Sequence, residues 1–195
     1  PAGRRAMEIA IEKAKKTGIG VAAVRNSGHF GACGFYVLQA VDAGFIGMDT
    51  TSASGINMAP TNGAQARLRT DPIAFAAPGK PGEPFLLDMA TTTVAAGKIR
   101  NKANEGLQTP TGWLVTKDGL PSTDPHEVSK GGYMTPLGGT PEGSSHKGYG
   151  LGAQAMAGGS FKASLFTIAW PTGEFGGMGL EGAVQLGFRR ALDAI

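Results

Sequence analysis

The pattern of apolar and polar positions predicts alternating helices and strands in the first fifty residues. Apolar residues spaced by three and four predict a helix over Arg4–Thr17, and Gly18 is placed to be its C-cap. The apolar run Ile19–Val24 predicts a short buried strand. A second helix is expected over Ala32–Ala43 and a second strand over Phe45–Asp49. This order, with helices as crossovers between strands, predicts an α/β fold.

The middle of the chain predicts two more strands, over Ile73–Ala77 and Phe85–Leu87. A helix is expected to follow and to run to about Asn104, with Thr91 or Thr92 as its N-cap. A helix that begins directly after a strand presents free backbone N–H groups, so this position is a candidate anion site.

The sequence patterns that predict the later elements are weaker than those in the first half of the chain. Asp118-Gly119 predicts a tight turn with strand-like residues before it, and residues Ser122–Pro141 are expected to form a surface excursion. Phe161–Trp170 predicts a strand, and Ala183–Ile195 a terminal helix.

Composition excludes several classes of protein. An apolar share of 41% in 195 residues supports a hydrophobic core, and no apolar run is long enough for a transmembrane helix. The basic residues behind the net charge of +3 are dispersed, which disfavours nucleic-acid binding. The single cysteine, Cys33, cannot form an internal disulfide and fits a cytoplasmic protein, and no Cys/His cluster has zinc spacing.

His29 is the first candidate for chemistry. It lies between Gly28 and Phe30 in a turn that follows a predicted strand, where functional side chains often lie. Imidazole groups exchange protons near neutral pH, so His29 is a candidate acid or base. The alternative is a histidine that only bonds the backbone of its own turn. Cys33 nearby is either a nucleophile or a small buried residue.

Two further stretches contain polar groups among turn residues. Thr51 and Ser52 lie near a strand end, where hydroxyl groups suit a phosphate or ribose but equally suit turns and caps. Lys147 lies beside Gly148 and could bind a phosphate or carboxylate, or be an ordinary surface lysine. The glycine spacing around it matches neither a Walker loop nor the Rossmann dinucleotide fingerprint.

Four stretches in this order resemble the malate/L-lactate dehydrogenase family of NAD(P)-dependent oxidoreductases, which is unrelated to the Rossmann-type enzymes. The four stretches are Val24–Gly31, Asp71–Pro78, Leu87–Thr92 and His146–Leu151. The resemblance implies a non-Rossmann α/β fold with a mixed sheet flanked by helices, a homodimer, and a site between domains. It covers roughly residues 4–158.

The resemblance also implies roles for individual residues. His29 matches the family's histidine, the acid/base at the substrate oxygen. The other matches lie on the side of the nicotinamide cofactor, which would be NAD or NADP, and they are Thr51, Ser52, Asp88, Met89, Ala90, Thr91, His146, Lys147 and Gly148. The implied substrate is a small 2-hydroxy or 2-oxo acid, with no nucleic-acid or membrane partner.

The sequence departs from the family in places. A preceding region with a Ser-His-Gly motif and an arginine is not in these 195 residues, and the part after Leu151 is shorter than in relatives. We therefore interpret residues 1–195 as one NAD(P)-binding catalytic domain of a partial chain. Arg69 replaces the glycine of a Gly-Thr-Asn-Pro turn, which predicts strain if its φ is positive.

Three functions remain open. The first is a dehydrogenase of malate or lactate type, which transfers a hydride between NAD(P) and a 2-hydroxy acid. The second is a cyclic imino acid reductase with the same residues. The third is a cofactor-binding remnant without activity.

Overall fold

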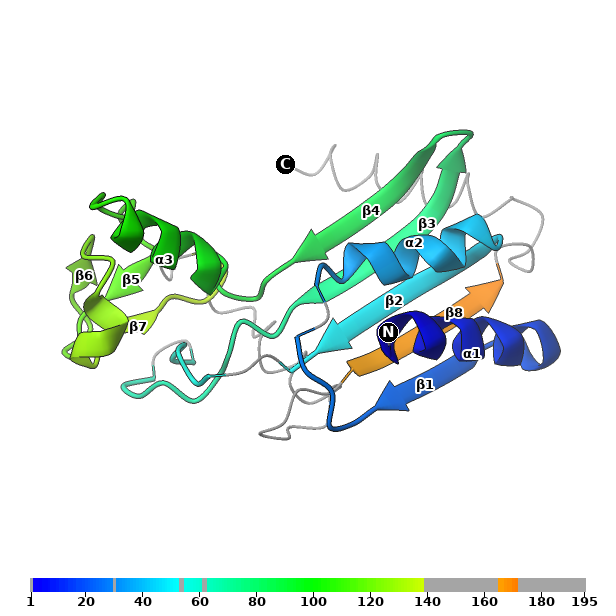
Figure 1. Cartoon of the computed structure of the whole chain (residues 1–195), viewed down its shortest axis with the longest axis horizontal. Helices are drawn as coiled ribbons and strands as arrows, with labels where there is room; N and C mark the ends of the chain where they lie inside the picture. Colours follow the sequence, from blue (N-terminus) through cyan, green and yellow to red (C-terminus); the bar gives the residue numbers. More distant parts are fainter. Residues whose placement is uncertain (1, 30, 53–54, 61–62, 139–164, 172–195) are drawn as a thin grey trace. The chain divides into compact units, whose positions relative to one another are not determined.

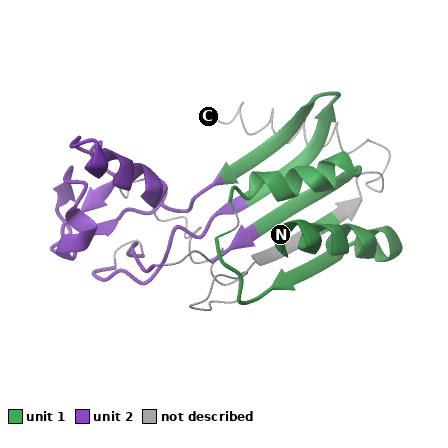
Figure 2. Ribbon diagram, in the orientation of Figure 1, with its two compact units in different colours: residues 1–49, 74–88, 165–195 green, residues 50–73, 89–164 purple. Residues whose placement is uncertain are grey.

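The computed structural model describes residues 2–29, 31–52, 55–60, 63–138 and 165–171. The chain divides into two compact units, which Figure 2 shows in different colours. Unit 1 comprises residues 1–49, 74–88 and 165–195, and unit 2 comprises residues 50–73 and 89–164. The prediction of one cofactor-binding domain over the whole chain stays a prediction.

Unit 1 is built on a five-stranded sheet with the order β1-β8-β2-β3-β4 (Figure 1). Its strands are β1 (Gly20–Val24), β8 (Leu165–Pro171), β2 (Phe45–Thr51), β3 (Ile73–Lys80) and β4 (Glu83–Met89). β8 pairs antiparallel with β1, with Gly20 opposite Ala169. The sheet thus places β8, which is remote in sequence, between the first two strands of the chain.

Two helices, α1 (Ala2–Thr17) and α2 (Gly34–Asp42), cover one face of this sheet (Figure 1). The apolar stripe of α1 is buried in a core that also includes Val37, Ala40 and Ala74. The close approach of α1 to β1 requires Gly20, because a Cβ atom there would lie 1.7 Å from the carbonyl oxygen of Ala10. The α/β class and the expected helix–strand–helix–strand order are confirmed.

The element boundaries differ from the sequence expectation in the middle of the chain. β2 continues through Thr51, and both β3 and β4 extend toward a tight turn at Pro81-Gly82. Gly82 has a φ of 79°, which a side chain would strain. The sequence ended the first of these strands at Ala77 and began the next at Phe85, because residues 78–82 contain two prolines and two glycines, but pairing between the strands overrides that local preference.

Unit 2 contains the helix α3 (Ala96–Asn104), the 3₁₀-helix η1 (Glu127–Lys130) and a small sheet with the order β6-β5-β7. The strands are β5 (Leu114–Val115), β6 (Pro121–Ser122) and β7 (Tyr133–Met134). The predicted turn at Asp118-Gly119 is confirmed, since it joins β5 to β6. Its core contains Val94, Ile99, Leu114 and Met134.

Two predictions in this unit are wrong. The N-cap of α3 is Ala95, so neither Thr91 nor Thr92 caps it, and the helix does not start directly after a strand. The surface excursion expected over residues 122–141 contains β7, in which Tyr133 and Met134 are buried. The short strand escapes detection because two residues are too few to show a periodicity.

Of the strand expected at residues 161–170, residues 165–170 are confirmed as part of β8, whereas residues 161–164 and the expected helix at residues 183–195 lie outside the described residues. Within the described part of the chain, no helix combines the length and the apolar character that a bilayer crossing requires.

Candidate functional site

The turn between β1 and α2 presents His29 at the surface. The backbone N–H of Gly31 donates a hydrogen bond to Nδ1 of His29 at 3.1 Å. A ring nitrogen that accepts a hydrogen bond carries no proton, so a neutral His29 in this geometry holds its proton on Nε2. The ring is thus oriented by its own turn and has Nε2 as its second polar atom.

The backbone of this turn adopts an uncommon conformation. Asn26 has a φ of 58°, and among the described residues it is the one non-glycine with a positive φ. Asparagine adopts this left-handed conformation more readily than most residues, but at a cost in backbone energy. Strained residues cluster at functional sites, so this observation adds to the case for the His29 turn.

The start of α2, directly after this turn, is held from β4. Cys33 is the N-cap residue, and its side chain makes no capping hydrogen bond. Instead, Asp88 in β4 accepts a hydrogen bond from the N–H of Gly34 at 2.8 Å on its Oδ2 atom. A carboxylate near the N-terminus of a helix is favourable because it bonds a free N–H and faces the positive end of the helix dipole.

Cys33 is not a nucleophile in this structure. Its side chain is 1% exposed. Burial raises the pKa of the Cys33 thiol far above its ordinary value, and the nearby carboxylates of Asp49 and Asp88 raise it further. The thiol therefore stays protonated, and the alternative of a small buried residue is the one confirmed.

Behind the start of α2 lies a buried acidic residue that the sequence did not reveal. Asp49 in β2 is fully buried. The pKa of the Tyr36 hydroxyl is raised by burial, and then by Asp49 and Cys33. A carboxylate at this position was missed because it follows four residues of an apolar strand and no motif marks it.

In unit 2, buried hydroxyl groups gather around residues 69–72. Thr50 donates from Oγ1 to the carbonyl of Pro72 at 2.9 Å, and Thr91 donates from both N and Oγ1 to the carbonyl of Thr70. Residues from the end of β2, from the segment before β3 and from the segment after β4 therefore meet within this unit.

Arg69 is the buried cation of this group. Its side chain is 3% exposed and donates to Oγ of Ser52 at 3.3 Å, and its backbone N–H donates to Asp71, which is fully buried. Arg69 does not have a positive φ, so the condition for backbone strain is not met. The sequence marked Arg69 as unusual, but it gave no sign that a charged side chain would be buried here.

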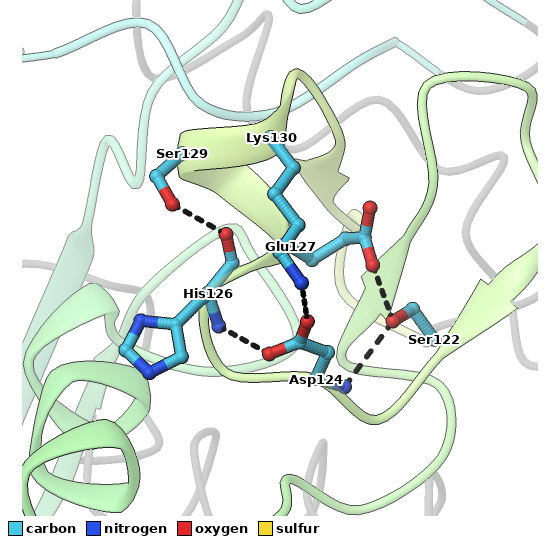
Figure 3. A network of polar contacts seen from close by, with 6 residues as sticks. All are labelled: Ser122, Asp124, His126, Glu127, Ser129 and Lys130. Carbon is cyan, nitrogen blue, oxygen red and sulfur yellow. Dashed lines mark hydrogen bonds and ion pairs between the residues drawn. The ribbon is translucent and has the colours of Figure 1, made fainter.

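A third polar group, in unit 2, surrounds η1 and contains the second described histidine (Figure 3). Asp124 accepts from the backbone N–H of His126 at 2.9 Å and pairs with Lys130, and Ser122 donates to Glu127 at 2.6 Å. The imidazole of His126 points away from these contacts (Figure 3). The group includes Ser, His and Asp residues, but their side chains do not form a nucleophile–base chain.

Comparisons with known proteins place these groups in context. A sequence profile described as malate/L-lactate dehydrogenase matches residues 1–162. The chain belongs to this family. Malate dehydrogenase from Pyrococcus abyssi is 49% identical over 150 residues, which cover 76% of this chain and 41% of that protein. The chain thus matches less than half the length of this member of the malate/L-lactate dehydrogenase family.

Solved structures of similar proteins have the same fold as this chain. Sulfolactate dehydrogenase from Methanocaldococcus jannaschii has a TM-score of 0.76 and 35% identity, and the match covers 99% of this chain and 58% of that one. The delta1-piperideine-2-carboxylate reductase from Pseudomonas syringae has a TM-score of 0.82 and 25% identity, over 97% and 61% of the two chains. The non-Rossmann α/β fold expected of the malate/L-lactate dehydrogenase family is confirmed.

The residues predicted to lie in the site fall into separate groups. His29 and Asp88 belong to unit 1. Thr51, Ser52 and Thr91 belong to unit 2, where they are among the buried threonine and serine residues near residues 69–72. Met89 and Ala90 are half-buried. The remaining predicted residues, His146, Lys147 and Gly148, lie outside the described residues. Among those that the structure describes, no group of three or more His, Cys, Asp or Glu side chains could hold a metal ion.

Proposed function

We propose that this chain is part of an oxidoreductase that transfers a hydride between NAD(P) and a small 2-hydroxy or 2-oxo acid, of malate or lactate type. One observation carries the proposal beyond family membership. His29, in the family's motif, is exposed after β1 and held by Gly31 through Nδ1, which leaves Nε2 to face a reactant.

His29 would act on the substrate oxygen. With its proton on Nε2, the ring can donate a hydrogen bond to a carbonyl oxygen, where negative charge develops as the carbonyl is reduced. Transfer of a proton to that oxygen requires the doubly protonated ring, in which Nδ1 carries a proton and no longer accepts from Gly31. The nicotinamide, when bound, supplies or accepts the hydride. The hydrogen bond from Gly31 fixes the ring orientation, so less conformational freedom is lost when the substrate binds.

The described residues fit a nicotinamide cofactor unequally. Met89 and Ala90 are half-buried and can border a flat ring, and Asp88 is exposed beside them in sequence. Ser52 and Thr91, in contrast, are buried, and their hydroxyl groups contact Arg69 and the carbonyl of Thr70. We propose that these two residues, together with Thr51, shape the backbone of the cofactor-side segments, and that Met89 and Ala90 contact the ring.

A second candidate is a cyclic imino acid reductase. The reductase from Pseudomonas syringae has a similar structure, and its name states that it reduces a cyclic imine carboxylate. The same His29 would then lie near the imine nitrogen. A remnant that binds the cofactor but catalyses nothing is the third candidate, and the binding of reduced cofactor without turnover would distinguish it.

The proposed protein is a cytoplasmic homodimer that uses NAD or NADP. The dimer is an expectation carried over from the family.

The test is the absorbance of reduced nicotinamide. The purified chain is mixed with NADH or NADPH and, in separate samples, with 2-oxo acids and a cyclic imine carboxylate. Oxidation with a 2-oxo acid alone is expected, and it would also identify the cofactor. Oxidation with the imine alone would favour the second candidate. Binding of reduced cofactor without any turnover would favour the remnant.

A further inference from the structure

The carboxylate of Asp88 joins two parts of unit 1 that are 54 residues apart in sequence. Asp88 is the last residue but one of β4, and Gly34 is the first residue of α2. Their hydrogen bond, of 2.8 Å from N to Oδ2, satisfies a backbone N–H that the helix itself cannot satisfy. Asp88 therefore does from a distant strand what an N-cap side chain does locally.

The residue at position 34 is suited to this contact. A Cβ atom on Gly34 would lie 2.9 Å from Oδ2 of Asp88 and 3.3 Å from its Cβ atom. Any side chain would therefore push the carboxylate away from the N–H group. The local N-cap residue, Cys33, offers no alternative, since its side chain makes no capping hydrogen bond. The contact thus depends on both Gly34 and Asp88.

The position of this contact has a consequence for His29. The turn that carries His29 is anchored at one end by β1, whose residues pair with β8, and at the other end by the start of α2. Asp88 fixes this second end. Within the turn, the backbone at Asn26 is strained, and the ring of His29 is held through Gly31. A strained turn keeps one conformation only when its ends are fixed by the surrounding structure.

We propose that Asp88 is a positioning residue for His29. Its carboxylate holds the first N–H of α2, and through it the turn that aims the His29 ring. The proposal rests on the proposed function of His29, and it assigns to Asp88 a role that needs no contact with substrate or cofactor. A shift of about 1 Å at a reacting group can reduce turnover about 100-fold, so an anchor of this kind matters for the rate.

Three variants test this role. Asp88→Ala removes the acceptor, whereas Asp88→Asn keeps an oxygen that can accept from Gly34. Glu83→Ala is the matched control, because it removes another exposed carboxylate from the other end of β4. The readouts are hydrogen exchange of the Gly34 amide, the NMR signal of the His29 ring, thermal unfolding, and kcat and KM.

In Asp88→Ala we expect faster exchange at Gly34, a shifted or broadened His29 signal, and a kcat about 10- to 100-fold lower, with a smaller change in the KM for the cofactor. Asp88→Asn should bring the exchange rate at Gly34, the His29 signal and the kcat most of the way back to the values of the unsubstituted chain. Glu83→Ala should change none of these quantities. An unchanged His29 signal in Asp88→Ala would overturn the proposal. So would Asp88→Asn being as impaired as Asp88→Ala, since the charge itself would then be what matters.

Loss of the folded state in Asp88→Ala would also overturn it, because Asp88 would then stabilise the whole unit rather than the His29 turn. The proposed function fails separately. If the unsubstituted chain oxidises no reduced nicotinamide with any acceptor, the exchange and NMR measurements still decide whether Asp88 positions His29.

Discussion

Among the residues that the structure describes, two exposed turns each contain a histidine, and the hydrogen bonds of the two histidines differ. In the turn after β1, the bond from Gly31 ends on the ring of His29. In the turn before η1, the bonds of His126 involve its backbone, with the N–H donating to Asp124 and the carbonyl accepting from Ser129 (Figure 3).

The ring of His29 is thus oriented by a hydrogen bond, whereas at His126 the hydrogen bonds hold the backbone and not the ring. A reactive imidazole needs a fixed ring orientation and a defined tautomer, and His29 has a hydrogen bond that supplies both. At His126, the hydrogen bonds and the ion pair of Asp124 with Lys130 stabilise the turn itself. Both histidines are thus exposed, and the atom that takes part in the hydrogen bond, a ring nitrogen or a backbone atom, distinguishes them.

The largest effect is expected from removing the ring of His29, and removing the ring of His126 is the control. His29→Ala should lower kcat by about 10²–10⁴-fold, because the transition state loses its acid/base group, while the Kd for the cofactor changes little. His126→Ala, the control, should leave kcat unchanged. Both side chains are exposed, so neither melting temperature should shift by much. Equal losses of turnover and of cofactor affinity in His29→Ala would contradict the acid/base role.

A smaller effect is expected from the backbone of the His29 turn. Asn26 has a φ of 58°, so Asn26→Val should cost about 1–2 kcal/mol, because a β-branched residue is strained in this region. Asn26→Gly should be tolerated, since glycine adopts a positive φ without strain. Urea unfolding measures the two free energies. If valine and glycine are equally stable there, the turn does not keep this backbone conformation in solution.

The sequence predicted much of unit 1 because its elements have clear periodicities and glycine ends. The stripe of α1, its end at Gly18 and the strand β2 all follow from residues close together in the chain. The insertion of β8 between β1 and β2 was not predictable, because it depends on pairing with a segment more than 100 residues away. Asp88 illustrates the same limit at the site, because its partner Gly34 is distant in sequence.

Unit 2 was predicted less well for a different physical reason. Its strands β5, β6 and β7 are two residues long, and the positions of Thr91 and Thr92 are decided by tertiary hydrogen bonds. A threonine before a helix is a good local cap, but Thr92 donates to the carbonyl of Val94 instead. Local preference fails where a polar side chain can choose between several buried partners.

The smallest effect is expected in the turn before η1. It is an effect on the free energy of unfolding, and the sign of its pH dependence follows from the pKa of Asp124. The hydrogen bond from Lys130, and then that from the backbone of His126, lowers the pKa of Asp124 below its ordinary value of 3.8. A carboxyl group with a lowered pKa in the folded state stabilises the protein above its unfolded pKa, and this stabilisation is lost as the pH falls through the folded value. Asp124→Asn should therefore be slightly less stable than the unsubstituted chain at neutral pH, and the difference should disappear in acid.

This last comparison is measured by urea unfolding from neutral pH down to about pH 3, at low and high salt, with kcat recorded in parallel. Salt should reduce the difference at neutral pH, because Lys130 is exposed and Asp124 only half-buried, so ions screen the pair. The kcat of Asp124→Asn should equal that of the unsubstituted chain under the same conditions, because the ion pair stabilises a turn whose histidine has no oriented ring. A fall in kcat for Asp124→Asn at unchanged stability would contradict the distinction between the two turns, since it would give the turn before η1 a part in the reaction.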